Sequence, residues 1–179
     1  ALRDVGRDVH AGDWGGYVQT ADNLSQEGSC WLFGDAIACE GALVSQDARM
    51  SDQTVLRGSA LVSGTAQVSG NAVVEDQAIV MAGTVGGDCF ISGNAVLAGN
   101  RQTDEAPSVT GQAAVYGKVY GAVLVSGNSV ILPGMQIDMP TLDVLEIRDG
   151  QTMLHRIRGK GRNISTPTAK KARNGGPER

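Results

Sequence analysis

The chain has 179 residues, of which 41% are hydrophobic and only 4% are aromatic. This length suits a single domain of ordinary size, and the hydrophobic share excludes a chain that is disordered throughout. The 25 glycines are about twice the usual share whereas the 5 prolines are few, so a collagen or a proline-rich linker is also excluded. The core must therefore be built from small aliphatic side chains.

Charge is divided unevenly along the chain, whose net charge is −4. Residues 1–155 contain 7 Lys and Arg against 18 Asp and Glu, a net charge of −11. Residues 156–179 contain 8 against 1, a net charge of +7. A basic block of this kind predicts contact with an anionic partner. The candidate partner-binding residues are Arg156, Arg158, Lys160, Arg162, Lys170, Lys171, Arg173 and Arg179.

The sequence contains neither a signal-peptide pattern nor an apolar run long enough to span a bilayer. We therefore expect a soluble protein that is made in the cytoplasm and has no membrane partner. The three cysteines, Cys30, Cys39 and Cys89, are an odd number with no paired spacing and no neighbouring histidine. This pattern predicts free thiols, and we expect no disulfide, no metal and no other cofactor.

A six-residue repeat dominates the middle of the chain. A small residue recurs at every sixth position, at Ala36, Ala42, Ala48, Thr54, Ala60, Ala66, Ala72 and Ala78. A mostly larger apolar residue follows two positions later, at Ala38, Val44, Met50, Leu56, Val62, Val68, Val74 and Val80. A turn position lies two residues before each small residue, at Gly34, Glu40, Gln46, Asp52, Gly58, Gly64, Gly70 and Asp76.

The repeat slips by one residue between Met81 and Gly87, resumes with Cys89 in the small position, and ends near residue 132. Residues two apart share one side of an extended chain, so the small and aliphatic positions form the interior. A six-residue period is too short for a strand, a crossover helix and a return. It predicts an all-β solenoid, a single-stranded parallel β-helix in which each strand stacks on the strand one coil earlier.

These hexapeptides resemble those of the hexapeptide-repeat proteins that form a left-handed parallel β-helix. The resemblance implies left-handed winding, three hexapeptides per coil, four to five coils over residues 34–132, and assembly as a trimer. A right-handed β-helix of the bactofilin kind is the structural alternative, because parallel crossovers generally prefer that hand.

Residues 1–33 are predicted to form an N-terminal cap. The large side chains that the repeats lack gather here, and we expect Trp14, Tyr17, Leu24 and Trp31 to cover the first coil. The orders AGDWGGYV at 11–18 and NLSQEGSCW at 23–31 resemble a cap found in bacterial and phage-encoded hexapeptide proteins, among them the YdcK-like transferases. This resemblance is specific for the fold and implies no particular reaction.

Three further segments depart from the repeat. The polar stretch 98–109 is predicted to be a loop that leaves a corner of the helix. Within residues 133–158, the runs 144–148 and 151–157 flank Asp149-Gly150, which predicts a β-hairpin that caps the last coil or offers its edge to another chain. Residues 159–179 form the basic tail, whose composition is typical of a segment that a partner must hold in place.

Side chains suited to catalysis are scarce. Hexapeptide acyltransferases use a histidine as general base, and the γ-carbonic anhydrases of this fold bind metal through three histidines. The chain has only His10 and His155, and both lie outside the recognisable hexapeptides. The adjacent acids Glu75 and Asp76, or Asp104 and Glu105, have the chemistry of an acid and a base, but such turn acids are usually only solvated. We assign no catalytic, cofactor-binding or metal-binding residue.

The sequence therefore favours a non-catalytic assembly module that forms oligomers and docks through its basic tail on an acidic protein surface. The phage resemblance of the cap suggests a virion component, such as a capsid decoration or a tail-associated protein. Two alternatives stay open: an acyltransferase-like enzyme of the hexapeptide family, and a protein that binds nucleic acid through phosphates without sequence preference. Protein docking is favoured, because non-specific nucleic acid seldom holds a tail in one conformation.

Overall fold

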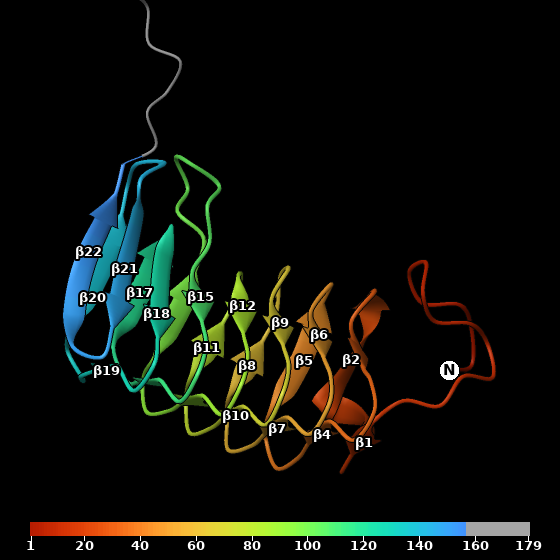
Figure 1. Cartoon of the computed structure of the whole chain (residues 1–179). Helices are drawn as coiled ribbons and strands as arrows, with labels where there is room; N and C mark the ends of the chain where they lie inside the picture. The colour runs from red at the N-terminus through yellow and green to blue at the C-terminus, as the bar shows by residue number, and fades with distance from the viewer. Residues whose placement is uncertain (157–179) are drawn as a thin grey trace, which may run out of the picture.

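In the computed structural model, which describes residues 1–156, the chain winds into a β-solenoid of seven stacked coils (Figure 1). Each coil contributes one strand to each of three parallel sheets. The first sheet contains β1 (Tyr17–Val18), β4 (Ile37–Ala38), β7 (Val55–Leu56), β10 (Val73–Val74), β13 (Phe90–Ile91), β16 (Ala114–Val115) and β19 (Val130–Ile131). The all-β parallel β-helix predicted from the repeat is thus confirmed, while its handedness stays a prediction.

The other two sheets complete the triangular cross-section. The second sheet contains β2 (Leu24–Gly28), β5 (Leu43–Gln46), β8 (Leu61–Val62), β11 (Ile79–Val80), β14 (Val96–Ala98), β17 (Lys118–Gly121) and β20 (Gln136–Met139). The third sheet contains β3 (Trp31–Leu32), β6 (Arg49–Met50), β9 (Gln67–Val68), β12 (Thr84–Val85), β15 (Ser108–Val109), β18 (Val123–Ser126), β21 (Val144–Arg148) and β22 (Gln151–His155).

Strand register shows that one coil takes three hexapeptides. In the first sheet Ile37 pairs with Val55 and Val55 with Val73, each step being 18 residues. The one-residue slip falls at the corner between β11 and β12, so that Val73 pairs with Phe90 after 17 residues. Between β14 and β15 the inserted loop lengthens the next step, from Thr84 to Ser108. Irregularities are therefore absorbed at corners, and the stacking of the strands continues.

The turn position of every hexapeptide lies in the left-handed region of backbone conformation. All eight predicted turn residues from Gly34 to Asp76 have φ between 58° and 75°. Four of them are not glycine: Glu40, Gln46, Asp52 and Asp76. Glycine is required where the next coil comes close, since a Cβ added at Gly58 would lie 2.8 Å from the backbone nitrogen of Asp76.

The interior is filled by the two positions that the repeat predicts. Every small residue from Ala36 to Ala78 and every residue two positions later, from Ala38 to Val80, is at most 1% exposed. Cys89 takes the small position of its hexapeptide and is 1% exposed, as predicted. The paired strands leave an interior too narrow for aromatic rings, which explains the low aromatic content.

Stacking extends further at both ends than the hexapeptide pattern indicates. Part of the predicted cap, residues 17–32, forms β1, β2 and β3 and so constitutes the first coil. The prediction that the solenoid ends near Leu132 is wrong, because β20 and β21 still pair in parallel with β17 and β18. Larger side chains fill these last strands, and Ile137, Met139, Leu145 and Ile147 pack against the core cluster.

The predicted C-terminal hairpin is confirmed. Strands β21 and β22 pair antiparallel from Val144 with His155 to Arg148 with Gln151. The two turn residues, Asp149 and Gly150, have φ of 49° and 77°, and positive values at both are what a type I′ turn requires. The hairpin therefore adds one antiparallel strand to an otherwise parallel third sheet.

The segment before β1 lies against the first two coils. The Arg3 guanidinium donates a hydrogen bond of 2.6 Å to the carbonyl oxygen of Gln26, and Asp8 forms an ion pair of 3.3 Å with Arg49. Val9 is 2% exposed and anchors the segment. The short 3-10 helix η1 (Ala21–Asn23) precedes β2. In residues 1–156 no helix has the length and apolar character needed to cross a bilayer.

Candidate functional site

The acids Glu75 and Asp76 both serve the solenoid. Glu75 forms an ion pair with Arg57, whose Nε lies 2.7 Å from the Glu75 carboxylate. Asp76 accepts hydrogen bonds from the Ser92 hydroxyl at 2.6 Å and from the Gly93 backbone N–H at 3.0 Å. These two bonds, that from Ser92 above all, hold the pKa of Asp76 below its ordinary value. Both carboxylates are therefore committed to contacts between coils, which does not suit an acid and base pair.

Asp104 and Glu105 lie in the inserted loop, and their backbones close it. The Asp104 N–H donates to the carbonyl oxygen of Asn100, and the Asn100 N–H donates to that of Glu105, at 2.9 and 2.8 Å. The Asn100 amide also donates to Asp138 of β20, which fastens the loop to the second sheet. A hollow of about 520 Å³ lies beneath the loop, lined by Met81, Val96, Ala98, Gly99, Asn100, Arg101, Gln102, Tyr120, Gln136, Asp138 and Pro140.

The two histidines lie at opposite ends of the solenoid. His10 belongs to the N-terminal segment, where its backbone N–H donates to Asp13 at 2.7 Å. His155 ends β22, and its Nε2 lies 2.6 Å from a carboxylate oxygen of Glu146 on the neighbouring strand. Because the histidines are separated by the length of the body, they do not form one site.

The cysteines are packing residues. Cys30 and Cys89 are buried, and burial raises the pKa of both thiols, while Cys39 is half-buried. The Cys89 thiol donates to the carbonyl oxygen of Gly86 at 2.9 Å. Among residues 1–156 no three His, Cys, Asp or Glu side chains are grouped in a way that would hold a metal ion.

The four cap residues do not act as one lid. Trp31 lies in β3 and is half-buried, and Leu24 packs against the core cluster. Tyr17 lies in β1 with 62% of its surface exposed. Trp14 was expected to cover the first coil, but the structure corrects this, since 97% of its surface is exposed.

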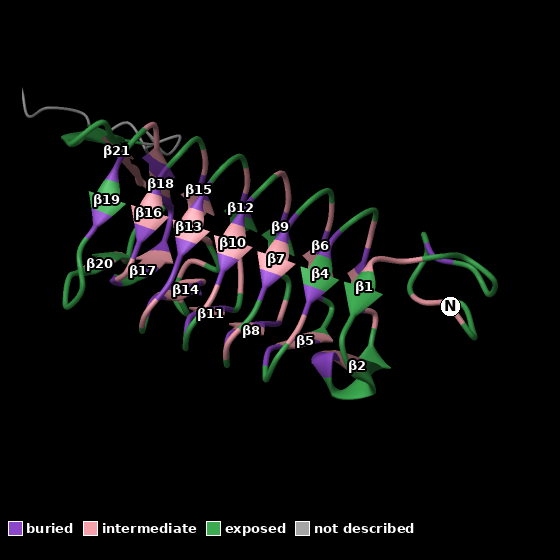
Figure 2. Cartoon of the chain, turned by 90° about the horizontal axis from the view of Figure 1, so that it is seen from below, coloured by how far each residue is buried: buried purple, intermediate pink, exposed green. Residues whose placement is uncertain are grey.

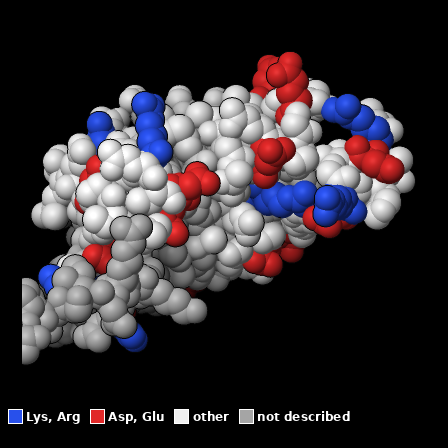
Figure 3. All heavy atoms as spheres, turned by 90° about the horizontal axis from the view of Figure 1, so that it is seen from above, with Lys and Arg blue, Asp and Glu red and all other residues white. Residues whose placement is uncertain are grey.

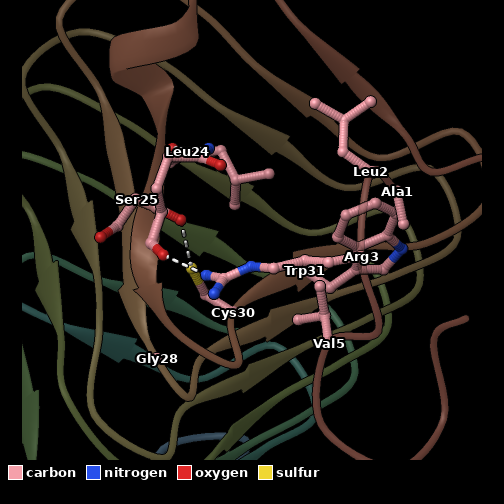
Figure 4. Close-up of a pocket in the computed structure, with 10 residues that line it drawn as sticks. Ala1, Leu2, Arg3, Val5, Leu24, Ser25, Gly28, Cys30 and Trp31 are labelled. Carbon is pink, nitrogen blue, oxygen red and sulfur yellow. Dashed lines mark hydrogen bonds between the residues drawn. The ribbon is translucent and has the colours of Figure 1, made fainter. Parts of the chain in front are cut away.

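A hollow of about 480 Å³ lies between the N-terminal segment and the first coil. Figure 4 shows the Arg3 side chain reaching across this hollow toward Ser25 and Cys30. Leu2, Val5, Leu24 and Trp31 supply its apolar lining. The Arg3 guanidinium donates a hydrogen bond to the Gln26 carbonyl, so it occupies a backbone acceptor of β2 at this end of the sheet.

Two of the three outer faces carry a ladder of apolar side chains, at positions for which the hexapeptide pattern predicts no particular residue type. The first-sheet ladder contains the outward residues of paired strands, Tyr17, Ile37, Val55, Val73, Phe90, Ala114 and Val130. The second-sheet ladder contains Leu43, Leu61, Ile79 and Val96. Figure 2 shows the first-sheet strands as half-buried in the middle and exposed at β1, β4 and β19. Each side chain thus partly covers its neighbours above and below.

The third sheet differs from the other two. Its outward residues are Trp31, Arg49, Gln67, Thr84, Ser108, Leu124 and Glu146, most of which are polar. The sequence does contain this signal: the residue after each small position is aliphatic in two hexapeptides of every three. A period of 18, superimposed on the period of six, would have revealed it. Apolar side chains aligned on an exposed face are typical of interaction surfaces.

Strongly exposed apolar side chains gather at the ends of the solenoid. Leu2, Trp14, Tyr17, Val18 and Ile37 lie near one end, and Val130, Leu132, Met135, Leu142, Met153 and Leu154 near the other. Met81 is the single large apolar residue of this exposure described between them. Most of the strongly exposed large apolar residues described therefore lie near the two ends.

The basic tail, residues 159–179, lies outside the described residues, and of the partner-binding candidates the structure describes Arg156 alone. Arg156 directly follows β22 and is exposed. The other seven partner-binding candidates, from Arg158 to Arg179, belong to residues 157–179. Figure 3 shows Asp and Glu on one face of the body as several separate groups, with Lys and Arg between them. The negative charge of the body is thus distributed along it.

The fold and its repeats define the chain as a hexapeptide-type parallel β-solenoid. The chain is 42% identical over 52 residues to a protein named "uncharacterized acetyltransferase YdcK" of Escherichia coli (strain K12). The aligned stretch covers 28% of this chain and 16% of that protein. No family model matches the chain. The short match agrees with the predicted YdcK-like relationship, while the resemblance to phage-encoded proteins stays a prediction.

Proposed function

We propose that the protein is a non-catalytic assembly module that forms homo-oligomers through the apolar ladders of its first and second sheets. The ladders are the observation that carries this proposal. They present aligned apolar side chains at coil spacing, whereas the candidate acids are engaged in contacts between coils and the histidines are far apart. Burying the ladders against another copy removes their apolar surface from water, which is the main driving force for association.

The ladders favour a closed ring of copies. They lie on two different sheets, so the first sheet of one copy packing on the second sheet of the next is a heterologous contact. Such contacts close into rings when the rotation between copies permits. A trimer is the ring that the resemblance to hexapeptide-repeat proteins implies, and the polar third sheet would then face solvent.

The basic tail supplies a second contact. Residues 156–179, which include the tail, carry a net charge of +7 and the remaining residues −11, so the tail complements the body of a neighbouring copy or of a larger acidic scaffold. We place this docking on a protein surface, as the sequence favours. The setting in a phage virion rests on the sequence resemblance of the cap alone.

Light scattering of ladder variants tests the oligomer. Val55→Arg and Val73→Arg place a charge in the middle of the first-sheet ladder, on side chains that point away from the core. Gln67→Arg, on the outer face of the third sheet, is the matched control. We expect the ladder variants to lose the mass of the ring while the control keeps the mass of the intact protein. Ladder variants that keep the intact mass would refute the proposed interface.

A deletion of residues 159–179 tests the tail. Light scattering should show that the deletion changes the mass of the assembly or abolishes binding to an acidic partner. If neither the mass nor the binding changes, tail docking is ruled out. A labelled peptide of residues 159–179, titrated with the truncated chain, should bind less tightly as salt is raised. Retention of the intact chain on DNA with a steeper salt dependence would favour the nucleic-acid alternative.

An acyltransferase activity is the second candidate function. The match to a protein named as an acetyltransferase favours it, as does the hollow beneath the inserted loop, which Arg101 of the loop and Tyr120 of β17 both line. Calorimetry with acetyl-CoA tests it. Heat of binding that is lost in Arg101→Ala would support the enzyme hypothesis, and no binding at millimolar ligand would count against it.

A further inference from the structure

The outer edge of β22 is open to another strand. Within residues 1–156, β22 pairs only with β21, and all five of its residues are exposed. Its sequence, QTMLH, has no Lys, Arg, Asp, Glu or Pro, and its pairing with β21 shows no bulge. Natural sheets usually protect an exposed edge with such features. This edge therefore lacks the usual protection against pairing with another strand.

The other end of the solenoid is protected where this one is not. The register of β2 shifts between Leu24 and Gly28, and the Arg3 guanidinium covers the Gln26 carbonyl on that strand. At the C-terminal end, β19 is an edge of only two residues, whereas β22 has five. The longest unprotected edge in the described part of the chain is thus β22.

The hairpin register fixes which groups of β22 point outward. In a hairpin with a two-residue turn, the pair that flanks the turn is hydrogen-bonded, and hydrogen-bonded pairs then alternate along the strands. Arg148 and Gln151 flank the turn, so Gln151, Met153 and His155 bond to β21. The backbone N–H and C=O groups of Thr152 and Leu154 therefore face the open edge.

We propose that β22 pairs antiparallel with β22 of a second copy, about a two-fold axis at Met153. This register places Thr152 opposite Leu154 of the second copy, which matches all the outward backbone groups. Met153 is 57% exposed in the single chain, and this register buries it against Met153 of the second copy. Leu154 shares a sheet face with Leu145 and Ile147, so the contact extends the apolar end of the core.

Charge supports the same register. Arg156 would lie opposite Gly150 of the second copy and near Asp149, whose exposed carboxylate also accepts the Asn128 N–H at 2.8 Å and lies 3.8 Å from Arg148 of its own chain. The two-fold axis produces this favourable pair twice. A contact made by the same patch on both partners closes after two copies and does not propagate into a fibre.

The pairing deepens the proposed function, because it names a second contact by which the assembly module joins copies. It differs from the ladder interface in position and symmetry. If both contacts form, the two-fold axis links two rings through their C-terminal ends. Ladder variants then reduce the ring without separating the β22 pair, and β22 variants separate the rings without opening them, so the failure of one proposal is distinguishable from the failure of the other.

The introduction of a charge at Met153 tests the pairing in the full-length chain. Met153→Glu and Met153→Lys each place like charges face to face across the axis, and each should weaken the pairing by about tenfold or more. An equal mixture of the two variants should restore it. Light scattering at matched concentrations measures the mass, and Gln67→Glu, on the same sheet but distant from β22, is the control. Variants that keep the paired mass, or a mixture that fails to recover it, would overturn the proposal.

A proline variant and a truncation complete the test. Leu154→Pro removes an outward N–H and leaves the hydrogen bonds to β21 in place, so it should also abolish pairing, with an unchanged far-ultraviolet spectrum. The chain ending at residue 158 should pair as the full-length chain does. If only the truncated chain pairs, the segment 159–179 of the same chain covers β22, and the proposal of a second copy is wrong.

Discussion

The carboxylate of Asp76 accepts a hydrogen bond from the Ser92 hydroxyl, 2.6 Å away and one coil later. The same carboxylate oxygen accepts the backbone N–H of Gly93 at 3.0 Å. Comparable bonds run from the Gly58 N–H to Glu40 and from the Gly70 N–H to Asp52, at 2.7 and 2.8 Å. The acids at the turn positions therefore fasten each coil to the next, which gives them a structural role that the sequence had not indicated.

This role predicts a loss of stability in acid. The hydrogen bonds to Asp76 lower its pKa in the folded chain, and those from Ser29 lower the pKa of Asp47. A lowered folded pKa contributes stability that is complete above the unfolded value, about 3.9, and is lost as pH falls through the folded pKa. Thermal unfolding followed by circular dichroism should show the melting temperature falling as pH decreases below about 4.

Replacement of Asp76 measures how much of the acid-dependent loss of stability comes from its carboxylate. Asp76→Asn should lower the melting temperature at pH 7 and flatten its acid dependence. Asp35→Asn is the control. Asp35 contacts the next coil through its backbone N–H, which donates to the Asp52 carbonyl oxygen at 2.9 Å and is kept in the variant. An Asp76→Asn variant whose acid dependence equals that of the intact chain would show that the carboxylate contributes nothing to coil stacking.

Two glycines of similar backbone conformation predict different costs of substitution. Gly70 and Gly93 have φ of 75° and 65°, but a Cβ at Gly70 would lie 2.8 Å from the nitrogen and oxygen of Gly87, while a Cβ at Gly93 meets nothing within 4 Å. Gly93→Ala should cost roughly 1–2 kcal/mol from the left-handed conformation alone. Gly70→Ala should cost roughly 3 kcal/mol or more, since the coils must also separate. Denaturant unfolding measures both, and equal costs would contradict the close approach.

The narrow interior predicts poor tolerance of larger side chains. Ala72 is fully buried between paired strands, so Ala72→Leu should lower the free energy of unfolding by about 1–3 kcal/mol through overpacking. Gln67→Leu, on an outer face, should change it by less than about 0.5 kcal/mol. Both are measured at one fixed protein concentration, because association adds to apparent stability. An Ala72→Leu variant as stable as the control would show that the interior has free space.

Thiol labelling should distinguish the three cysteines. Cys30 and Cys89 are buried, with pKa values raised by burial, whereas Cys39 is half-buried at a corner. A thiol reagent added to the native chain should therefore modify Cys39 first, and the other two only on unfolding. Cys39→Ser should remove the early phase. Rapid labelling of all three in the native chain would contradict the packing role of Cys30 and Cys89.

Much of the fold follows from the hexapeptides because backbone stacking imposes the same conformation on each coil. The small residues, the apolar residues two positions later and the turn residues were all predicted, and each lies where its side chain volume or its φ requires. The first coil and the coil after Leu132 were missed because larger residues replace the small ones there. The prediction that Trp14 covers the first coil was wrong. A large aromatic ring is buried only where the backbone brings it against an apolar surface, and Trp14 is not held against the first coil in this way.

The candidate interfaces were harder to predict than the core. The ladder residues Val55 and Val73 stand at positions that tolerate any side chain as far as folding is concerned, so the six-residue pattern ignores them. Only the 18-residue coil aligns them on one sheet. The edge of β22 depends in turn on the way the hairpin joins the third sheet, which the run of residues 144–157 does not reveal alone.

The mass of the intact 179-residue chain in solution tests the assembly role most directly. Light scattering across a series of concentrations should give a multiple of the 18.5 kDa chain, three copies for the ring and six where β22 also pairs. The mass should fall to 18.5 kDa when Val55→Arg and Met153→Lys are combined. An intact chain that remains at 18.5 kDa at every concentration would contradict the account.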